Sequence, residues 1–170
     1  MTDRVGIIIG RFQVLTKAHE AIIKAMASNH KKSIVYLIKG KQTSKDLKKN
    51  PLDEKLQLKM LKKICPESVE IKVLPTAFIP DELNKLPERH YTLYAGSDRA
   101  KSYQSYEKYL EDGRELDVIE IKRDDDSISA TKARECLLNE DTKGYEAIVP
   151  AKTLEFTSEI TKALLKAQVP

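Results

Sequence analysis

Five short aliphatic runs alternate with stretches whose apolar residues recur every three or four positions, and this alternation limits the fold more than any other feature of the chain. The runs are Val5–Ile9, Ser33–Ile38, Val69–Leu74, Tyr91–Ala95 and Leu116–Ile121. The first run has no polar side chain, which is typical of a central strand buried on both faces. Repeated strand–helix–strand units predict an α/β fold with a doubly wound, parallel, five-stranded sheet.

Helical periodicity lies between these runs and continues after the last one. It covers residues 17–28, 51–64 and 99–110, and then residues 129–140, 144–149 and 153–168. A chain of 170 residues has the usual size of one domain. We therefore expect a single domain over residues 1–170, with a core over residues 4–135 and C-terminal helices over residues 136–170 that cover one edge of the sheet.

The charge of the chain is modest. Its 30 Lys and Arg residues against 26 Asp and Glu residues give a formal net charge of +4, which does not indicate nucleic acid as a partner. Five lysines gather in one polar segment, Lys39–Pro51, instead of forming a basic face studded with aromatic residues. Such a segment is most often a solvated loop, and the alternative is a lysine-bearing flap over an anion.

Cysteine spacing and hydropathy bear on the compartment. Cys65 and Cys136 have no metal-like spacing, so we expect buried free thiols and a reducing environment. The sequence has no signal-like segment at its start and no apolar run near the roughly 18 residues that a membrane span needs. We expect a cytoplasmic protein that does not bind a membrane.

Chemically active residues follow the first strand. Gly10-Arg11-Phe12-Gln13 comes directly after it, followed by Thr16 and His19. Gly10 allows a close approach of the backbone to a ligand. Thr16 is predicted to cap the next helix, which puts His19 in the first helical turn, where backbone N–H groups attract phosphate. A capping threonine beside a half-exposed histidine is the simpler interpretation of the same residues.

Two more strand ends carry similar residues. Gly96–Arg99 reads GSDR after the fourth run, and the carboxylate of Asp98 suits a ribose hydroxyl or a substrate amide. SISATKAR follows the fifth run, where Ser129, Thr131 and Arg134 suit phosphate at a helix entrance. Taken separately, the polar residues at each helix entrance are explained by ordinary helix capping. Three such entrances at the carboxyl ends of parallel strands, where open sheets bind ligands, indicate one site.

These stretches resemble the nucleotidylyltransferase superfamily marked by a (His/Thr)-x-Gly-His motif, especially its nicotinamide-mononucleotide adenylyltransferase-like and phage cytidylyltransferase-like branches. GRFQVLTKAH at residues 10–19 is similar to G-R-F-Q-P-x-(H/T)-x-G-H, and KNPLDEK at residues 49–55 is similar to K-N-P-(F/L)-x-x-x-(R/K). GSDR and ISATKAR are similar to G-x-D and I-S-x-T-x-x-R. Val14 and Ala18 depart from the usual proline and glycine.

The resemblance implies a Rossmann-like nucleotidylyltransferase domain and a reaction. A nucleoside triphosphate and a phosphate-bearing small molecule would be joined with release of pyrophosphate, and Mg²⁺ would be bound through the substrate phosphates without a protein metal site. The implied catalytic residues are Thr16, His19 and Arg134. The implied nucleotide-binding residues are Gly10, Arg11, Phe12, Gln13, Gly96, Asp98, Ser129 and Thr131. Lys39 and Lys41 are candidates for a further phosphate contact.

Several alternatives stay open. The GRFQ start favours ATP and nicotinamide mononucleotide, although the chain has no tryptophan, so a ring stack would fall to Tyr103 or Phe78. The KKNPL, GSDR and ISATKAR stretches look closer to the phage cytidylyltransferase-like branch, which would use CTP. Between the two, an adenylyltransferase is favoured over a cytidylyltransferase. A nucleotide-binding or structural protein that has lost the chemistry is a further alternative, supported by Val14 and Ala18, and a homo-oligomer is open too. A G-x-G-x-x-G dinucleotide-binding domain is not supported, because the first turn has one glycine.

Overall fold

The computed structural model describes residues 2–39, 50–121 and 126–168, without the side chains of residues 126–129. The chain divides into two compact units. The sheet unit comprises Met1–Gly10, Ile22–Ile38 and Pro66–Arg123, and the helical unit comprises Arg11–Ala21, Lys39–Cys65 and Asp124–Pro170. The expectation of a single domain over residues 1–170 stays a prediction.

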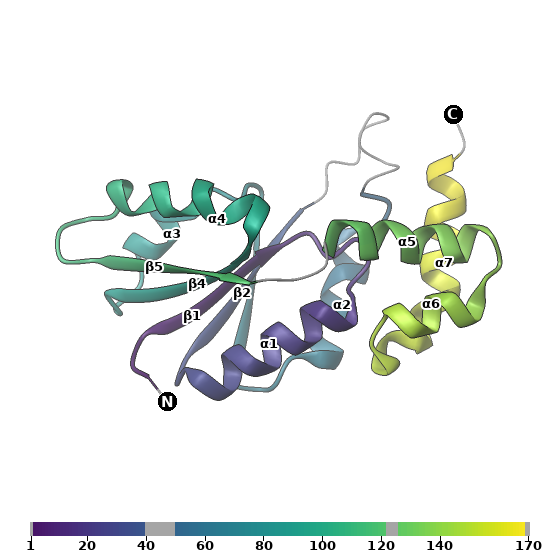
Figure 1. Ribbon diagram of the computed structural model, residues 1–170, viewed down its shortest axis with the longest axis horizontal. Helices are drawn as coiled ribbons and strands as arrows, with labels where there is room; N and C mark the ends of the chain where they lie inside the picture. The colour runs from purple at the N-terminus through teal and green to yellow at the C-terminus, as the bar shows by residue number, and fades with distance from the viewer. Residues whose placement is uncertain (1, 40–49, 122–125, 169–170) are drawn as a thin grey trace. The chain divides into compact units, whose positions relative to one another are not determined.

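The sheet unit contains a five-stranded parallel sheet with the strand order β3-β2-β1-β4-β5 (Figure 1). The strands are β1 (Val5–Gly10), β2 (Ser33–Ile38), β3 (Val69–Leu74), β4 (His90–Gly96) and β5 (Glu115–Ile121). All five strands and the doubly wound α/β fold predicted from the sequence are confirmed. Because the chain leaves β1 in one direction toward β2 and later returns to its other side as β4, the order reverses between β1 and β4.

Helices cover both faces of this sheet. On one face, α3 (Pro80–Asn84) and α4 (Ser97–Gln104) contribute Leu83 and Tyr103 to an apolar core that includes Ile7 and Tyr91. The opposite face carries the second half of α1 (Lys17–Asn29). A Cβ atom at Gly6 would lie 2.6 Å from Cγ of Met26, so the glycine allows this helix to pack directly on the strand.

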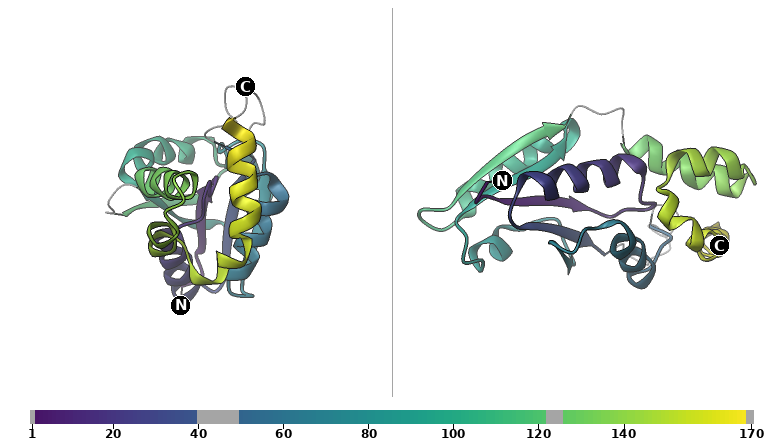
Figure 2. Two further views of the ribbon diagram at one scale, coloured as in Figure 1. Left: turned by 90° about the vertical axis from the view of Figure 1, so that its right-hand side faces the viewer. Right: turned by 90° about the horizontal axis from the view of Figure 1, so that it is seen from below.

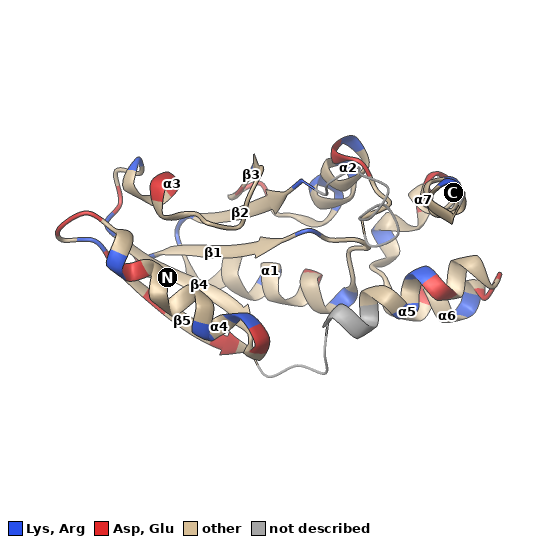
Figure 3. Ribbon diagram, turned by 90° about the horizontal axis from the view of Figure 1, so that it is seen from above, with Lys and Arg blue, Asp and Glu red and all other residues tan. Residues whose placement is uncertain are grey.

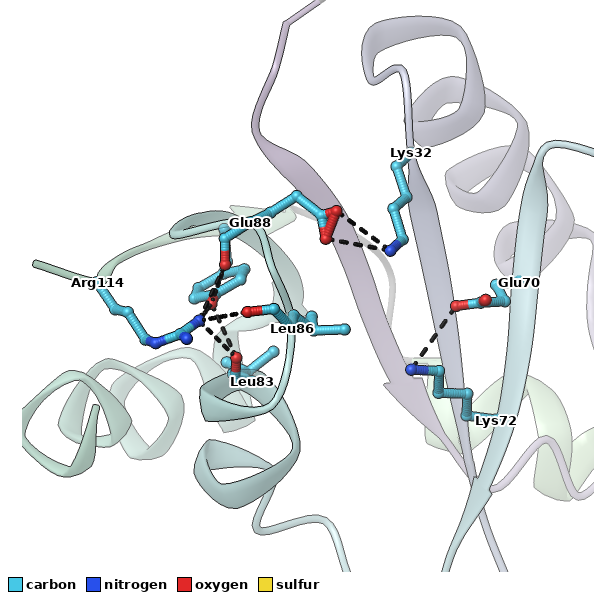
Figure 4. A network of polar contacts seen from close by, with 8 residues as sticks. Lys32, Glu70, Lys72, Leu83, Leu86, Glu88 and Arg114 are labelled. Atoms are coloured by element: carbon cyan, nitrogen blue, oxygen red, sulfur yellow. Dashed lines mark hydrogen bonds and ion pairs between the residues drawn. The ribbon is translucent and has the colours of Figure 1, made fainter. Parts of the chain in front are cut away.

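A single guanidinium closes the carboxyl end of α3. Nη1 of Arg114 donates to the carbonyls of Leu83 and Leu86 at 2.9 Å and to that of Glu88 at 3.0 Å (Figure 4). It also contacts the hydroxyl of Tyr91. Lys32 pairs with the Glu88 carboxylate at 3.1 Å in the same region. These bonds tie the end of α3 and the segment after it to the residue that precedes β5.

The helical unit contains α2 (Glu54–Ile64), α5 (Asp126–Leu138), α6 (Thr142–Ile148), a 3₁₀ segment η2 (Ala151–Phe156) and α7 (Thr157–Gln168). Figure 2 shows α7 beside α2. Two ion pairs connect α2 to the segments that follow α6: Lys59 pairs with Glu159 of α7 at 3.6 Å, and Lys63 pairs with Glu155 of η2 at 3.2 Å. Basic and acidic residues both occur along α5 and α6 (Figure 3). The helical pattern predicted for the C-terminal part is confirmed, except that the stretch expected over residues 153–168 divides into η2 and α7.

Three local predictions need correction. The helix expected from Pro51 begins at Glu54, because Asp53 accepts the N–H of Leu56 at 2.9 Å and caps it. The helix expected over residues 99–110 divides into α4 and a 3₁₀ segment η1 (Ser105–Tyr109). The short helix α3 was not predicted, because five residues are too few for a periodic pattern.

Both cysteines are free, with Cys65 half-buried and Cys136 buried. Burial raises the pKa of the Cys65 thiol to about 12. Within the described residues, none of the helices has the length and apolar character needed to cross a lipid bilayer.

Candidate active site

The turn between β1 and α1, residues 11–16, is the centre of the candidate site in the helical unit. Arg11 is exposed, whereas Phe12, Gln13 and Thr16 are 3%, 5% and 1% exposed. Phe12 has a φ of 51°, in the left-handed region that residues other than glycine rarely adopt. A non-glycine residue in that region costs about 1–3 kcal/mol and persists where surrounding contacts hold it.

Thr16 and His19 form a reciprocal pair at the start of α1. Oγ1 of Thr16 accepts the backbone N–H of His19 at 3.4 Å, so Thr16 caps the helix as predicted. In return, the backbone N–H of Thr16 donates to Nδ1 of His19 at 3.0 Å. This is a capping box in which a histidine takes the place of the usual glutamate. Since Nδ1 accepts, the proton of the neutral ring is on Nε2.

Phe12 packs against the ring of His19. The two ring centroids lie 5.0 Å apart in an edge-to-face arrangement, at an interplanar angle of 84°. The Phe12 ring is buried, and it holds the His19 ring through this aromatic contact. The orientation of His19 is therefore fixed by a backbone donor and by an aromatic ring.

Gln13 joins the turn to the segment that leads into α2. Its Nε2 donates to the carbonyl of Leu52 at 3.0 Å, and its Oε1 accepts the N–H of Leu52 at 2.9 Å. The buried side-chain amide therefore bonds to both the N–H and the C=O of Leu52, which is the pattern that the backbone of a paired β-strand would make. The sequence predicts a nucleotide contact for Gln13, and in the structure its side chain bonds to Leu52.

Arg134 of α5 lies on the same turn. Its Nη1 donates to the backbone carbonyl of Gln13, and its Nη2 donates to Oγ1 of Thr131 at 3.3 Å. Burial lowers the pKa of its guanidinium, which nevertheless stays charged at neutral pH because the ordinary value is 12.5. The helical unit thus brings Arg134, from the ISATKAR motif, onto the turn of the GRFQVLTKAH motif that carries Arg11, Thr16 and His19.

Gln57 is a site residue that the sequence analysis missed. It lies on the buried face of α2 with Leu56, Met60 and Leu61 and is 0% exposed. Its Nε2 donates to the backbone carbonyl of Arg11 at 2.5 Å. The sequence does contain one indication of this role: Gln57 is polar, although it occupies a position of the helical repeat at which an apolar residue is expected.

The sheet unit contains the predicted residues of the first and fourth strand ends. β1 and β4 are neighbours with Ile8 beside Tyr94, so Gly10 and Gly96 end the two strands at the same edge. This edge is where the strand order reverses, and open parallel sheets bind ligands there. Asp98 lies in the first turn of α4 with its side chain 68% exposed and Arg99 at 4.0 Å.

The remaining predicted residues are only partly described. Lys39 is exposed and pairs with Glu54 at 3.5 Å. Lys41 and the Ser129 side chain lie outside the described residues. Within the part of the chain that is described, no group of three or more His, Cys, Asp or Glu side chains could ligate a metal ion.

The all-parallel sheet, its order reversal and its flanking helices are the Rossmann-like fold of nucleotidyltransferases. The chain belongs to the cytidylyltransferase-like family, whose profile matches residues 7–136. This stretch includes the turn, the GSDR segment and Arg134. A comparison with curated protein sequences finds no significant match.

Solved structures show the same fold. A bifunctional NMN adenylyltransferase/ADP ribose pyrophosphatase from Francisella tularensis, complexed with AMP and a manganese ion, has a TM-score of 0.63 and 18% identity over 97% of this chain. The chain spans 52% of that enzyme's length. A Plasmodium falciparum nicotinic acid mononucleotide adenylyltransferase has a TM-score of 0.66 and 14% identity over 95% of this chain and 98% of its own.

Proposed function

We propose that this protein is a nucleotidylyltransferase that transfers a nucleotidyl group from a nucleoside triphosphate to a phosphate-bearing small molecule and releases pyrophosphate. The observation that carries the proposal is the paired arrangement of Thr16 and His19 at the first turn of α1, with the guanidinium of Arg134 bonded to the same turn. A donor fixed at a helix N-terminus beside an arginine is suited to phosphoryl oxygens.

The reaction needs positioning and charge neutralisation more than covalent chemistry. An oxygen of the acceptor phosphate attacks the α-phosphorus, and the bond from that phosphorus to the bridging oxygen of pyrophosphate breaks, so no enzyme-bound intermediate forms. His19, through its Nε2 proton, stabilises the charge that develops on the transferring phosphate. Arg11 and Arg134 hold the negatively charged oxygens of the triphosphate, together with the hydroxyls of Ser129 and Thr131.

A divalent ion fits this site only as part of the substrate. The turn offers guanidinium, imidazole and hydroxyl groups, which bind phosphate, and the described residues contain no carboxylate cluster for a bare ion. We propose that Mg²⁺ enters on the phosphates and neutralises part of their charge.

ATP and a nicotinamide-mononucleotide-type acceptor are the favoured substrates. The Francisella enzyme was solved with AMP, and the Plasmodium enzyme also with NaAD. Between the two aromatic candidates for stacking on the acceptor ring, Phe78 is 45% exposed and Tyr103 is 7% exposed. Exposure therefore favours Phe78. CTP is the second candidate, supported by the family to which the chain belongs.

The test is pyrophosphate release with ATP or CTP against a panel of phosphate-bearing acceptors that includes nicotinamide mononucleotide, in Mg²⁺. We expect release that requires one nucleotide and one acceptor and that disappears in His19→Ala. Absence of release from every pair, with a nucleotide still raising the melting temperature, would indicate a binding protein without the chemistry. Wild-type turnover in His19→Ala would reject the site assignment.

A further inference from the structure

We propose that Gln57 is a positioning residue that fixes the direction of the Arg11 side chain by holding the peptide plane that follows Arg11. This inference rests on the proposed function in its final step, where Arg11 meets a phosphate. Its first step, the hold on the turn, concerns the protein alone.

The first observation is that Gln57 is not explained by the packing of α2. The side chain is 0% exposed between apolar neighbours of the helix. Its Oε1 is buried and has no hydrogen-bond partner among the described residues. An unsatisfied buried acceptor is unfavourable, so a leucine or methionine would serve the core better. The stabilising contact of the amide is its bond to the Arg11 carbonyl.

The second observation is the orientation of that amide. Nε2 must face the Arg11 carbonyl, because the flipped amide would put two oxygens 2.5 Å apart. The carbonyl of Arg11 belongs to the peptide group that joins it to Phe12. Fixing this carbonyl therefore fixes the ψ angle of Arg11 and the approach to Phe12, whose φ is 51°.

The third observation is that the turn is held at two further points. Gln13 pairs with the backbone of Leu52, and Arg134 donates to the Gln13 carbonyl. Gln57 is the contact nearest to Arg11, whose own side chain is exposed. Arg11 therefore has a fixed backbone and a side chain open to solvent, which is the arrangement expected of an anion-binding arginine whose direction is set in advance.

The first experiment measures hydrogen exchange of the backbone amides in residues 11–16 in the intact protein. Gln57→Met keeps the volume and removes the donor, and we expect exchange in this turn to become at least about tenfold faster, as loss of one hydrogen bond allows. Met60→Ala is the control, since Met60 is also fully buried on α2 but has no polar contact with the turn. Equal exchange in both variants would overturn the proposal.

The second experiment is a double-mutant cycle on nucleotide affinity and turnover. We expect Gln57→Met to raise KM for the nucleoside triphosphate about tenfold, and to have little further effect when Arg11→Ala is already present. Effects that multiply in the double variant would mean that Gln57 does not act through Arg11, and would overturn the proposal. If the wild-type protein shows no turnover, the proposed function fails, and the same cycle is measured on the binding of inorganic triphosphate. Equal triphosphate affinity of the wild type and Gln57→Met would likewise overturn the proposal.

Discussion

The backbone N–H of Thr16 donates to Nδ1 of His19, so the histidine proposed to bind phosphate is held by the same residue that caps its helix. His19→Asn keeps an acceptor near Nδ1 and removes the far donor, while His19→Gln keeps a donor near Nε2. We expect His19→Asn to lower kcat about 10²–10³-fold, and His19→Gln to lower it less, because the donor at Nε2 stabilises the transition state. Pyrophosphate release under saturating substrates measures both.

His90 provides the control for this comparison. It lies at the start of β4 with its side chain 50% exposed and pairs with Glu115 at 3.2 Å. His90→Asn should leave kcat within about twofold, since surface changes of this kind alter stability by only about 0.5 kcal/mol. An equal loss in His19→Gln and His19→Asn would mean that the ring does not act through Nε2.

Arg134 needs the geometry of its guanidinium as well as its charge. In Arg134→Lys the charge remains, but an ammonium cannot bond the Gln13 carbonyl and meet a phosphate in the same fork-like geometry. Loss of one hydrogen bond to a charged group costs about 1.5–3 kcal/mol, so kcat/KM should fall about 10- to 100-fold. Lys132→Ala, an exposed charge on the same helix, is the control. A drop in Lys132→Ala as large as that in Arg134→Lys would contradict the specific role.

Arg114 is expected to stabilise the sheet unit. Removing its guanidinium in Arg114→Ala takes a charged donor from the carbonyls at the end of α3, which costs about 2 kcal/mol. A protein of this size should then melt about 4–8 °C lower. Arg89→Ala removes an exposed arginine with one bond to the Asp112 carbonyl at 3.2 Å, and should change the melting temperature by less than about 2 °C. Equal shifts would show that the carbonyl network carries no special weight.

The Cys65 thiol should be unreactive in the folded protein. Although the residue is only half-buried, burial raises its pKa from an ordinary value of 9.0 to about 12, so its thiolate fraction at pH 8 falls about a thousandfold. In the Cys136→Ala variant, which leaves one thiol, a chromogenic disulfide reagent should react correspondingly slowly until the protein is unfolded. Fast labelling of the native protein would contradict the burial.

The same shift gives a pH dependence of stability. The folded state favours the neutral thiol, so its contribution is complete below pH 9, the pKa of the unfolded chain, and is lost as the pH rises toward 12. Melting curves of the Cys136→Ala variant and of its double variant with Cys65→Ala should converge over this range.

The sequence predicts the sheet well because aliphatic runs buried on both faces have few other structures open to them. The helix entrance at Thr16 was also predictable, since capping is a local interaction. The roles of Gln57 and Gln13 were not, because their partners lie 46 and 39 positions away and only the folded backbone brings them together. The left-handed backbone conformation of Phe12, with a φ of 51°, could not be predicted either, since phenylalanine does not favour that conformation.

The bond from Arg134 to the Gln13 carbonyl spans 121 positions of the chain. During synthesis the turn is therefore made well before Arg134 of α5. If Arg134 binds the triphosphate as proposed, the anion site is complete only once α5 has been made and has folded onto the turn, so chains that still lack α5 would bind the nucleotide more weakly.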